Sequence, residues 1–100
     1  MCRLHLDTDI GGDIDDLCAL AMVLNWRESE LVAVTTVSEI DGKRAGYARY
    51  LLGIAGRNDV PVAAGADVAL GCYRHWRPGI HLDEHAYWPE PDPALAGCRC

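Results

Sequence analysis

Five aspartates lie within ten residues near the start of the chain, in the run Asp7-Thr8-Asp9-Ile10-Gly11-Gly12-Asp13-Ile14-Asp15-Asp16. Two carboxylates about 4 Å apart repel each other by roughly 4 kcal/mol at an effective dielectric constant near 20. Such a cluster therefore requires a cation, shared protons or full hydration. Carboxylate oxygens are the ligands that calcium and magnesium prefer, so the run predicts a site for a hard cation.

A strand, a glycine-containing loop and a helix are predicted to position these carboxylates. Residues Cys2 to Leu6 alternate weakly in polarity and end at Asp7, which indicates a short strand. Residues 8–13 form the loop after it, and its two adjacent glycines permit a tight turn. A helix is predicted from Asp15 to about Trp26, with acidic residues at its N-terminus, because one helical face is apolar: Leu17, Leu20, Ala21 and Leu24.

Two further strands and a second helix follow. Residues 31–37 are rich in β-branched side chains and almost continuously apolar, which is typical of a parallel strand covered on both faces. A helical face runs from about Lys43 to Ala55, and Gly56 stands where a C-terminal cap is expected. Residues 59–65 predict a third short strand. The order βαβαβ predicts an α/β fold with a mostly parallel sheet.

Residues 1–100 are expected to be a single and incomplete domain, with residues 1–68 as its core and residues 69–100 as a loop-rich segment that holds four of the five prolines. Right-handed crossovers in one direction place both helices on one face of a three-stranded sheet. The other face then needs cover, either from a missing C-terminal part or from a partner, such as a second copy in a homo-oligomer.

Charge and composition narrow the class of protein. The net charge of −6 and the absence of any basic block disfavour binding to nucleic acid. No apolar run is long enough to cross a membrane, and the N-terminus lacks an export signal, so a cytoplasmic location is expected. The five cysteines are odd in number and irregularly spaced, which favours reduced thiols over a disulfide framework.

The acidic run and three later segments resemble one known family. Asp7-Thr8-Asp9, a glycine, and Asp15-Asp16 followed by Ala19-Leu20 resemble the N-terminal signature of the nucleoside hydrolases that prefer inosine and uridine. Segments 34–37, 51–57 and 60–66 are similar to that family's sequence in the same order and at similar intervals. The resemblance covers roughly residues 3–68 and implies the N-terminal portion of a Rossmann-like nucleoside hydrolase fold.

The resemblance also implies an activity and a set of roles. It implies a hydrolase of nucleoside salvage that cleaves the N-glycosidic bond of a ribonucleoside with a calcium-activated water. Asp9 and Asp16 match the positions that hold Ca²⁺ in that family, and Asp15 matches the one that binds ribose hydroxyls. Asp9 is the expected general base, since a carboxylate in reach of the water can accept its proton. Asp7 is expected to orient the loop by accepting backbone hydrogen bonds.

Departures from the family leave alternatives open. The family's Asn after Thr-Thr-Val is missing, so either Glu39 or Asp41 replaces it or both are ordinary loop or helix-capping carboxylates. Asp13 belongs to a loop two residues longer than in some family members and is either a further contact or merely solvated. The family's later ribose-binding and calcium-binding segments have no counterpart within residues 1–100, so the metal site is expected to be incomplete.

Other classes of protein fit less well. An EF-hand would place Gly11 and Cys18 where calcium ligands are required, and a D-x-D phosphatase would require Thr or Val where Gly11 stands. His81, Glu84 and His85 are spaced like metal ligands but are also explained by a polar loop, and a zinc site using Cys72, Cys98 and Cys100 lacks paired spacing. The main alternative is a truncated, inactive metal-binding fragment of the same family. The preferred nucleobase and the leaving-group acid have no signal in the sequence.

Overall fold

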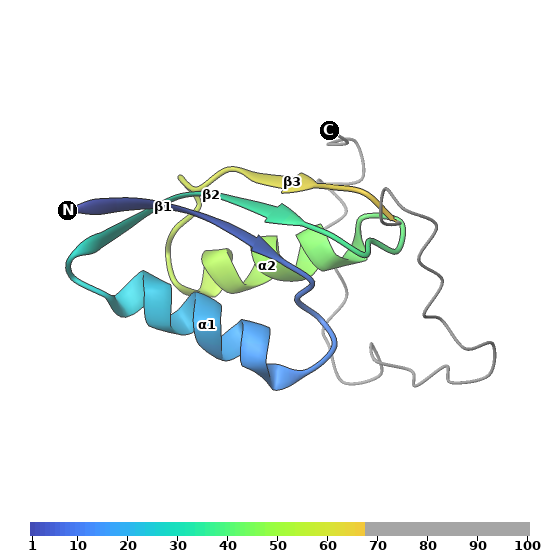
Figure 1. Cartoon of the computed structure of the whole chain (residues 1–100), viewed down its shortest axis with the longest axis horizontal. Helices are drawn as coiled ribbons and strands as arrows, with labels where there is room; N and C mark the ends of the chain where they lie inside the picture. The colour runs from blue at the N-terminus through green and yellow to red at the C-terminus, as the bar shows by residue number, and fades with distance from the viewer. Residues whose placement is uncertain (68–100) are drawn as a thin grey trace.

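A computed structural model describes residues 1–67 of the chain. It contains β1 (Cys2–Thr8), α1 (Ile14–Asn25), β2 (Ser29–Thr36), α2 (Lys43–Ile54) and β3 (Val62–Ala64) in alternating order. The three strands form one parallel sheet in the order β1-β2-β3 (Figure 1). The predicted α/β fold with a βαβαβ order is therefore confirmed. The predictions for the loop-rich segment 69–100, including its histidines and cysteines, lie outside the described residues.

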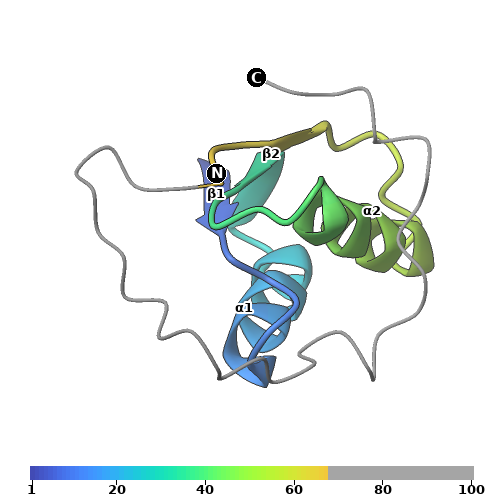
Figure 2. The same ribbon diagram turned by 90° about the vertical axis from the view of Figure 1, so that its right-hand side faces the viewer.

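Both helices cover the same face of the sheet, as the handedness of the two crossovers requires. Figures 1 and 2 show α1 and α2 side by side beneath the strands. The core lies between these two layers, where buried side chains of the strands, the helices and two loops meet: Ile10, Leu20, Leu31, Val34, Ala48, Leu52 and Val60. No element among residues 1–67 covers the other face of the sheet.

The strand ends differ by a few residues from those predicted, for reasons of backbone hydrogen bonding. β1 includes Asp7 and Thr8, because the carbonyl of Thr8 accepts a 3.1 Å hydrogen bond from the amide of Val37. β3 is shorter than predicted. Its pairing is limited to Val34–Thr36 of β2, and the residue before it is Pro61, which can accept from Val34 but has no N–H to donate. Because β1 and β2 are parallel, their carboxyl ends lie together at one end of the sheet.

At this end of the sheet, two glycines allow the backbone to lie close to other parts of the chain. Gly11 has a φ of +109°, and a Cβ there would collide with the ring of Tyr47 on α2. A Cβ on Gly65 would collide with the carbonyl oxygen of Thr36 at the end of β2. Gly56 follows α2 with a φ of +70°, as predicted for its C-terminal cap.

No helix among residues 1–67 combines the length and hydropathy needed to cross a bilayer.

Candidate acidic site at the carboxyl ends of β1 and β2

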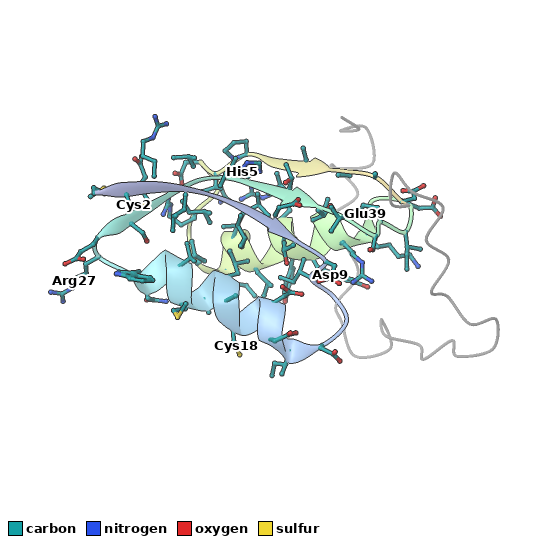
Figure 3. All side chains as sticks on the ribbon, viewed as in Figure 1. Cys2, His5, Asp9, Cys18, Arg27 and Glu39 are labelled. Atoms are coloured by element: carbon teal, nitrogen blue, oxygen red, sulfur yellow. The ribbon has the colours of Figure 1, made fainter. Side chains whose placement is uncertain are left out.

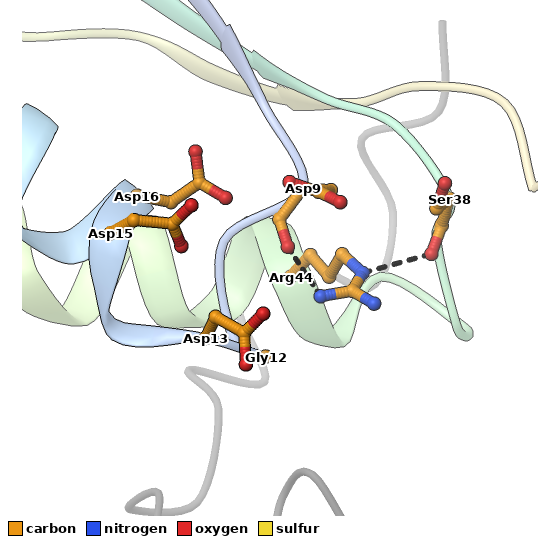
Figure 4. A pocket seen from close by; sticks show the side chains of 7 residues that line it. All are labelled: Asp9, Gly12, Asp13, Asp15, Asp16, Ser38 and Arg44. Carbon is orange, nitrogen blue, oxygen red and sulfur yellow. Dashed lines mark hydrogen bonds between the residues drawn. The ribbon is translucent and has the colours of Figure 1, made fainter. Parts of the chain in front are cut away.

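An open pocket of about 230 Å³ lies where β1 ends and α1 begins. Asp9, Asp13, Asp15 and Asp16 line it on the side of the first loop and helix, together with Gly12, and Ser38 and Arg44 line it on the side of β2 and α2 (Figure 4). The structure thus brings four of the predicted acidic residues together. Ligand sites of α/β proteins lie at this end of the strands.

The loop that carries Asp9 is held in shape by its neighbours. The hydroxyl of Thr8 accepts a 3.2 Å hydrogen bond from the amide of Ile10, whose side chain is fully buried in the core. Gly11 then turns against the ring of Tyr47. Thr8 and Ile10, the two neighbours of Asp9 in the chain, are both buried and fix the backbone between them. The exposed carboxylate of Asp9 is therefore directed at the pocket.

The start of α1 supplies the other carboxylates. Asp15 and Asp16 lie in its first turn, where the positive end of the helix dipole favours negative charge. Asp13 is the N-cap residue, but its side chain makes no capping hydrogen bond, and it lines the pocket as an exposed group. This placement is compatible with both predictions for Asp13, a further contact or a solvated side chain.

Asp16 has a pKa above its ordinary value. The main cause is the neighbouring side chain of Asp9, burial adds to it, and the negative charges of Asp9 and Asp15 raise the pKa further. The Thr8 side chain acts in the opposite direction. Asp9 and Asp16 therefore form a carboxylate pair in which ionisation of the second group is opposed. A proton or a cation between them relieves that repulsion.

Arg44, in the first turn of α2, is a site residue that sequence reasoning missed. It is 4% exposed, and its guanidinium donates from Nη1 to the carbonyls of Asp9 and Ile10 and from Nε to the carbonyl of Ser38 at 2.9 Å. It thereby ties the loop after β1 to the loop after β2 (Figure 4). The one available signal was its position, because a cation at a helix N-terminus is unfavourable without a local reason.

Glu39 is a capping residue for α2 in this structure. It is 5% exposed, and its carboxylate accepts hydrogen bonds from the Thr36 hydroxyl and from the backbone amides of Arg44 and Ala45, the latter at 2.9 Å. Of the two alternatives for Glu39, these contacts support helix capping. Asp41 is exposed in the turn before α2, with a φ of +53°, and the residues that line the pocket do not include it.

The prediction for Asp7 was wrong about its hydrogen-bond partner. Among the described residues, its carboxylate accepts a 2.6 Å hydrogen bond from the hydroxyl of Thr35 on β2, and no backbone donor of the loop reaches it. Because side chains alternate along β1, Asp7 lies on the face of the sheet opposite to the helices. Asp7 therefore links β1 to β2 through this hydrogen bond, and it is not among the residues that line the pocket.

Carboxylate oxygens line the pocket, and they are the kind of ligand that hard cations prefer. Calcium takes six to eight oxygen ligands. Among residues 1–67, no three His, Cys, Asp or Glu side chains are placed to hold one metal ion together. Asp9 and Asp16 are two neighbouring carboxylates, fewer than the six to eight oxygen ligands that calcium takes.

Comparisons with known proteins assign neither a family nor a function to this chain. No family model matches the chain, and no curated protein matches it. The resemblance to the inosine- and uridine-preferring nucleoside hydrolases therefore rests on the motifs within residues 3–68.

Proposed function

We propose that the chain takes part in hydrolysis of the N-glycosidic bond of ribonucleosides, with Ca²⁺ as its metal ion and a cytoplasmic location. The observation that carries the proposal is the carboxylate pair of Asp9 and Asp16 in a pocket that Asp15 also lines. A pair whose full ionisation is opposed has a physical reason to bind a divalent cation. The order Asp9, Asp15, Asp16 along the chain agrees with the family that the sequence resembles.

Each aspartate has a distinct role in this proposal. Asp9 and Asp16 hold the metal ion, which when bound supplies polarisation of the attacking water. Asp9, at the end of β1, accepts the proton of that water as the anomeric carbon develops positive charge. Asp15, one residue earlier on α1 than Asp16, accepts hydrogen bonds from the ribose hydroxyls. Arg44 holds the loop of Asp9 in position through its carbonyl contacts.

An assay of ribose release tests this proposal. Inosine, uridine and a p-nitrophenyl riboside would be offered to the full chain with calcium or with a chelator. The proposal predicts calcium-dependent release that Asp9→Asn abolishes and that Glu28→Gln retains, because Glu28 is an exposed carboxylate at the opposite end of the sheet, before β2. Absence of release from a folded, calcium-bound chain would contradict catalysis by this chain.

One observation favours a second candidate function. The carboxylate pair of Asp9 and Asp16 in the pocket is equally compatible with a metal-binding fragment that performs no hydrolysis, because the pair alone gives a reason to bind a cation and none to cleave a riboside. In that case calcium binds through Asp9 and Asp16, but no riboside is cleaved. Binding and ribose release measured on the same preparation distinguish the two functions.

A further inference from the structure

Two consecutive hydrogen bonds join three polar side chains of β1 and β2, which we call the polar bridge: His5, Thr35 and Asp7. The hydroxyl of Thr35 donates to the carboxylate of Asp7 at 2.6 Å, and Nε2 of His5 lies 2.9 Å from the same hydroxyl oxygen. Thr35 is the register partner of Asp7, and His5, two residues earlier on β1, reaches it diagonally. Figure 3 shows His5 on the side of the sheet away from the helices.

The chemistry of the three groups sets the direction of both hydrogen bonds. A carboxylate has no proton to donate, so the single proton of the Thr35 hydroxyl lies on the side of Asp7. The hydroxyl oxygen of Thr35 can then only accept from His5, which requires a proton on Nε2. In its neutral form the ring of His5 is therefore the tautomer with hydrogen on Nε2 and none on Nδ1.

The polar bridge lies directly after an irregularity in the pairing of the two strands. Val32 of β2 is an extra residue at the step from Leu4 to His5 on β1. An extra residue disrupts the ladder locally, and a slip by one residue turns every following side chain to the opposite face. The two hydrogen bonds form only where Thr35 lies opposite Asp7. They therefore favour the observed register over a slipped one.

The same register sets the relative position of the two loops that form the acidic pocket. Asp7 precedes Asp9 by two residues, and Thr35 precedes Ser38 by three. Asp9 lines the pocket on the side of β1, and Ser38 lines it on the side of β2 (Figure 4). A change of register between the strands would thus move one wall of the pocket relative to the other.

We propose that His5 and Thr35 are positioning residues for the calcium site of Asp9 and Asp16, acting through the register of β1 against β2. His5 donates to the hydroxyl of Thr35 and so leaves the hydroxyl proton for Asp7. Neither His5 nor Thr35 lines the pocket, so both act through Asp7 and the backbone that leads from it to Asp9. This inference rests on the proposed function, because the site that is positioned is the proposed one.

Thr35→Val and Thr35→Ser are a matched pair for the test. Valine has the shape of threonine without the hydroxyl, so Thr35→Val removes both hydrogen bonds, whereas Thr35→Ser keeps both. Calorimetric titration of the full chain with calcium should give a dissociation constant about three- to tenfold higher in Thr35→Val and close to that of the parent in Thr35→Ser.

Ser29→Ala is the control for the loss of a hydroxyl elsewhere on β2. The Ser29 hydroxyl donates to the carbonyls of Val23 and Trp26, at the opposite end of the strand and before the irregularity. Its loss should leave calcium affinity unchanged. His5→Leu and His5→Gln are a second pair, in which only glutamine can donate to Thr35 in place of Nε2, and only His5→Leu should weaken calcium binding. Far-UV circular dichroism checks that each variant is folded.

Nitrogen NMR of the His5 ring tests the polar bridge without calcium. In alkaline buffer the ¹⁵N shifts should show hydrogen on Nε2, and the signals of His5 are identified by their absence from His5→Gln. Hydrogen on Nδ1 alone would overturn the proposal. Equal calcium affinities of Thr35→Val and Thr35→Ser would overturn this role and leave the proposed function standing, whereas a folded parent that binds no calcium would overturn both.

Discussion

The side chain of Asp9 is the main cause of the raised pKa of Asp16. The two residues belong to different elements, the end of β1 and the first turn of α1, and they meet because the loop between them turns back at Gly11. The fold thus concentrates negative charge where a metal ion would compensate for it.

This pair should make the calcium-free protein sensitive to pH. The folded state retains the proton of Asp16 above the ordinary pKa of 3.8, at which the unfolded chain releases it. Over the interval between 3.8 and the raised pKa the folded state binds more protons, so the contribution of Asp16 to the free energy of unfolding falls as pH rises. Urea unfolding of the parent protein and of Asp16→Asn, both in chelator and over a range of pH, measures this contribution as the difference between their free energies of unfolding. A difference between the two proteins that does not change with pH would contradict it.

Replacement of Arg44 should weaken calcium binding as well as the fold. Arg44→Gln leaves the carbonyls of Asp9, Ile10 and Ser38 without their donor, and the loss of the buried bond to Ile10 costs about 1–3 kcal/mol. Arg49 on the same helix is a matched control, since it also donates to backbone carbonyls, those of Val60 and Arg57, away from the pocket. Arg49→Gln should lower the free energy of unfolding without changing calcium affinity. Equal effects of both variants on calcium affinity would exclude a positioning role for Arg44.

Glu39 should contribute to stability and not to metal binding. Glu39→Ala leaves the first amides of α2 and the hydroxyl of Thr36 without an acceptor, so a loss of about 1–3 kcal/mol is expected. Asp41→Asn should stay within about 0.5 kcal/mol of the parent, because the residue is exposed and Asn tolerates a positive φ. Chemical denaturation checks both values. A Glu39→Ala protein with unchanged stability and lost calcium binding would show that the residue is a ligand.

Gly11 should be more sensitive to substitution than Gly42. Gly11→Ala combines a positive φ with a collision between the new Cβ and Tyr47, whereas Gly42→Ala meets nothing within 4 Å and has only its φ of +78° against it. The expected cost is about 1 kcal/mol at Gly42 and at least twice that at Gly11. Thermal unfolding of the two variants measures the difference. A smaller loss at Gly11 would show that its loop moves freely away from α2.

The sequence predicted the elements of this fold well because its local signals agree. The β-branched run of β2, the apolar helical faces and Gly56 each favour one structure, and the crossover rule then places both helices on one face. The meeting of Asp9, Asp15 and Asp16 followed from the strand, loop and helix order. Arg44 was missed because its role depends on carbonyls 34 and 35 residues away in the chain. The partner of Asp7 was missed because it depends on the register of β1 against β2.

A calcium titration of the full chain, followed by calorimetry, tests the central claim most directly. The claim predicts one calcium ion per chain, with binding lost in Asp9→Asn and in Asp16→Asn and retained in Glu28→Gln. Absence of binding to the folded protein at millimolar calcium would contradict it, and so would binding that survives both substitutions in the pocket.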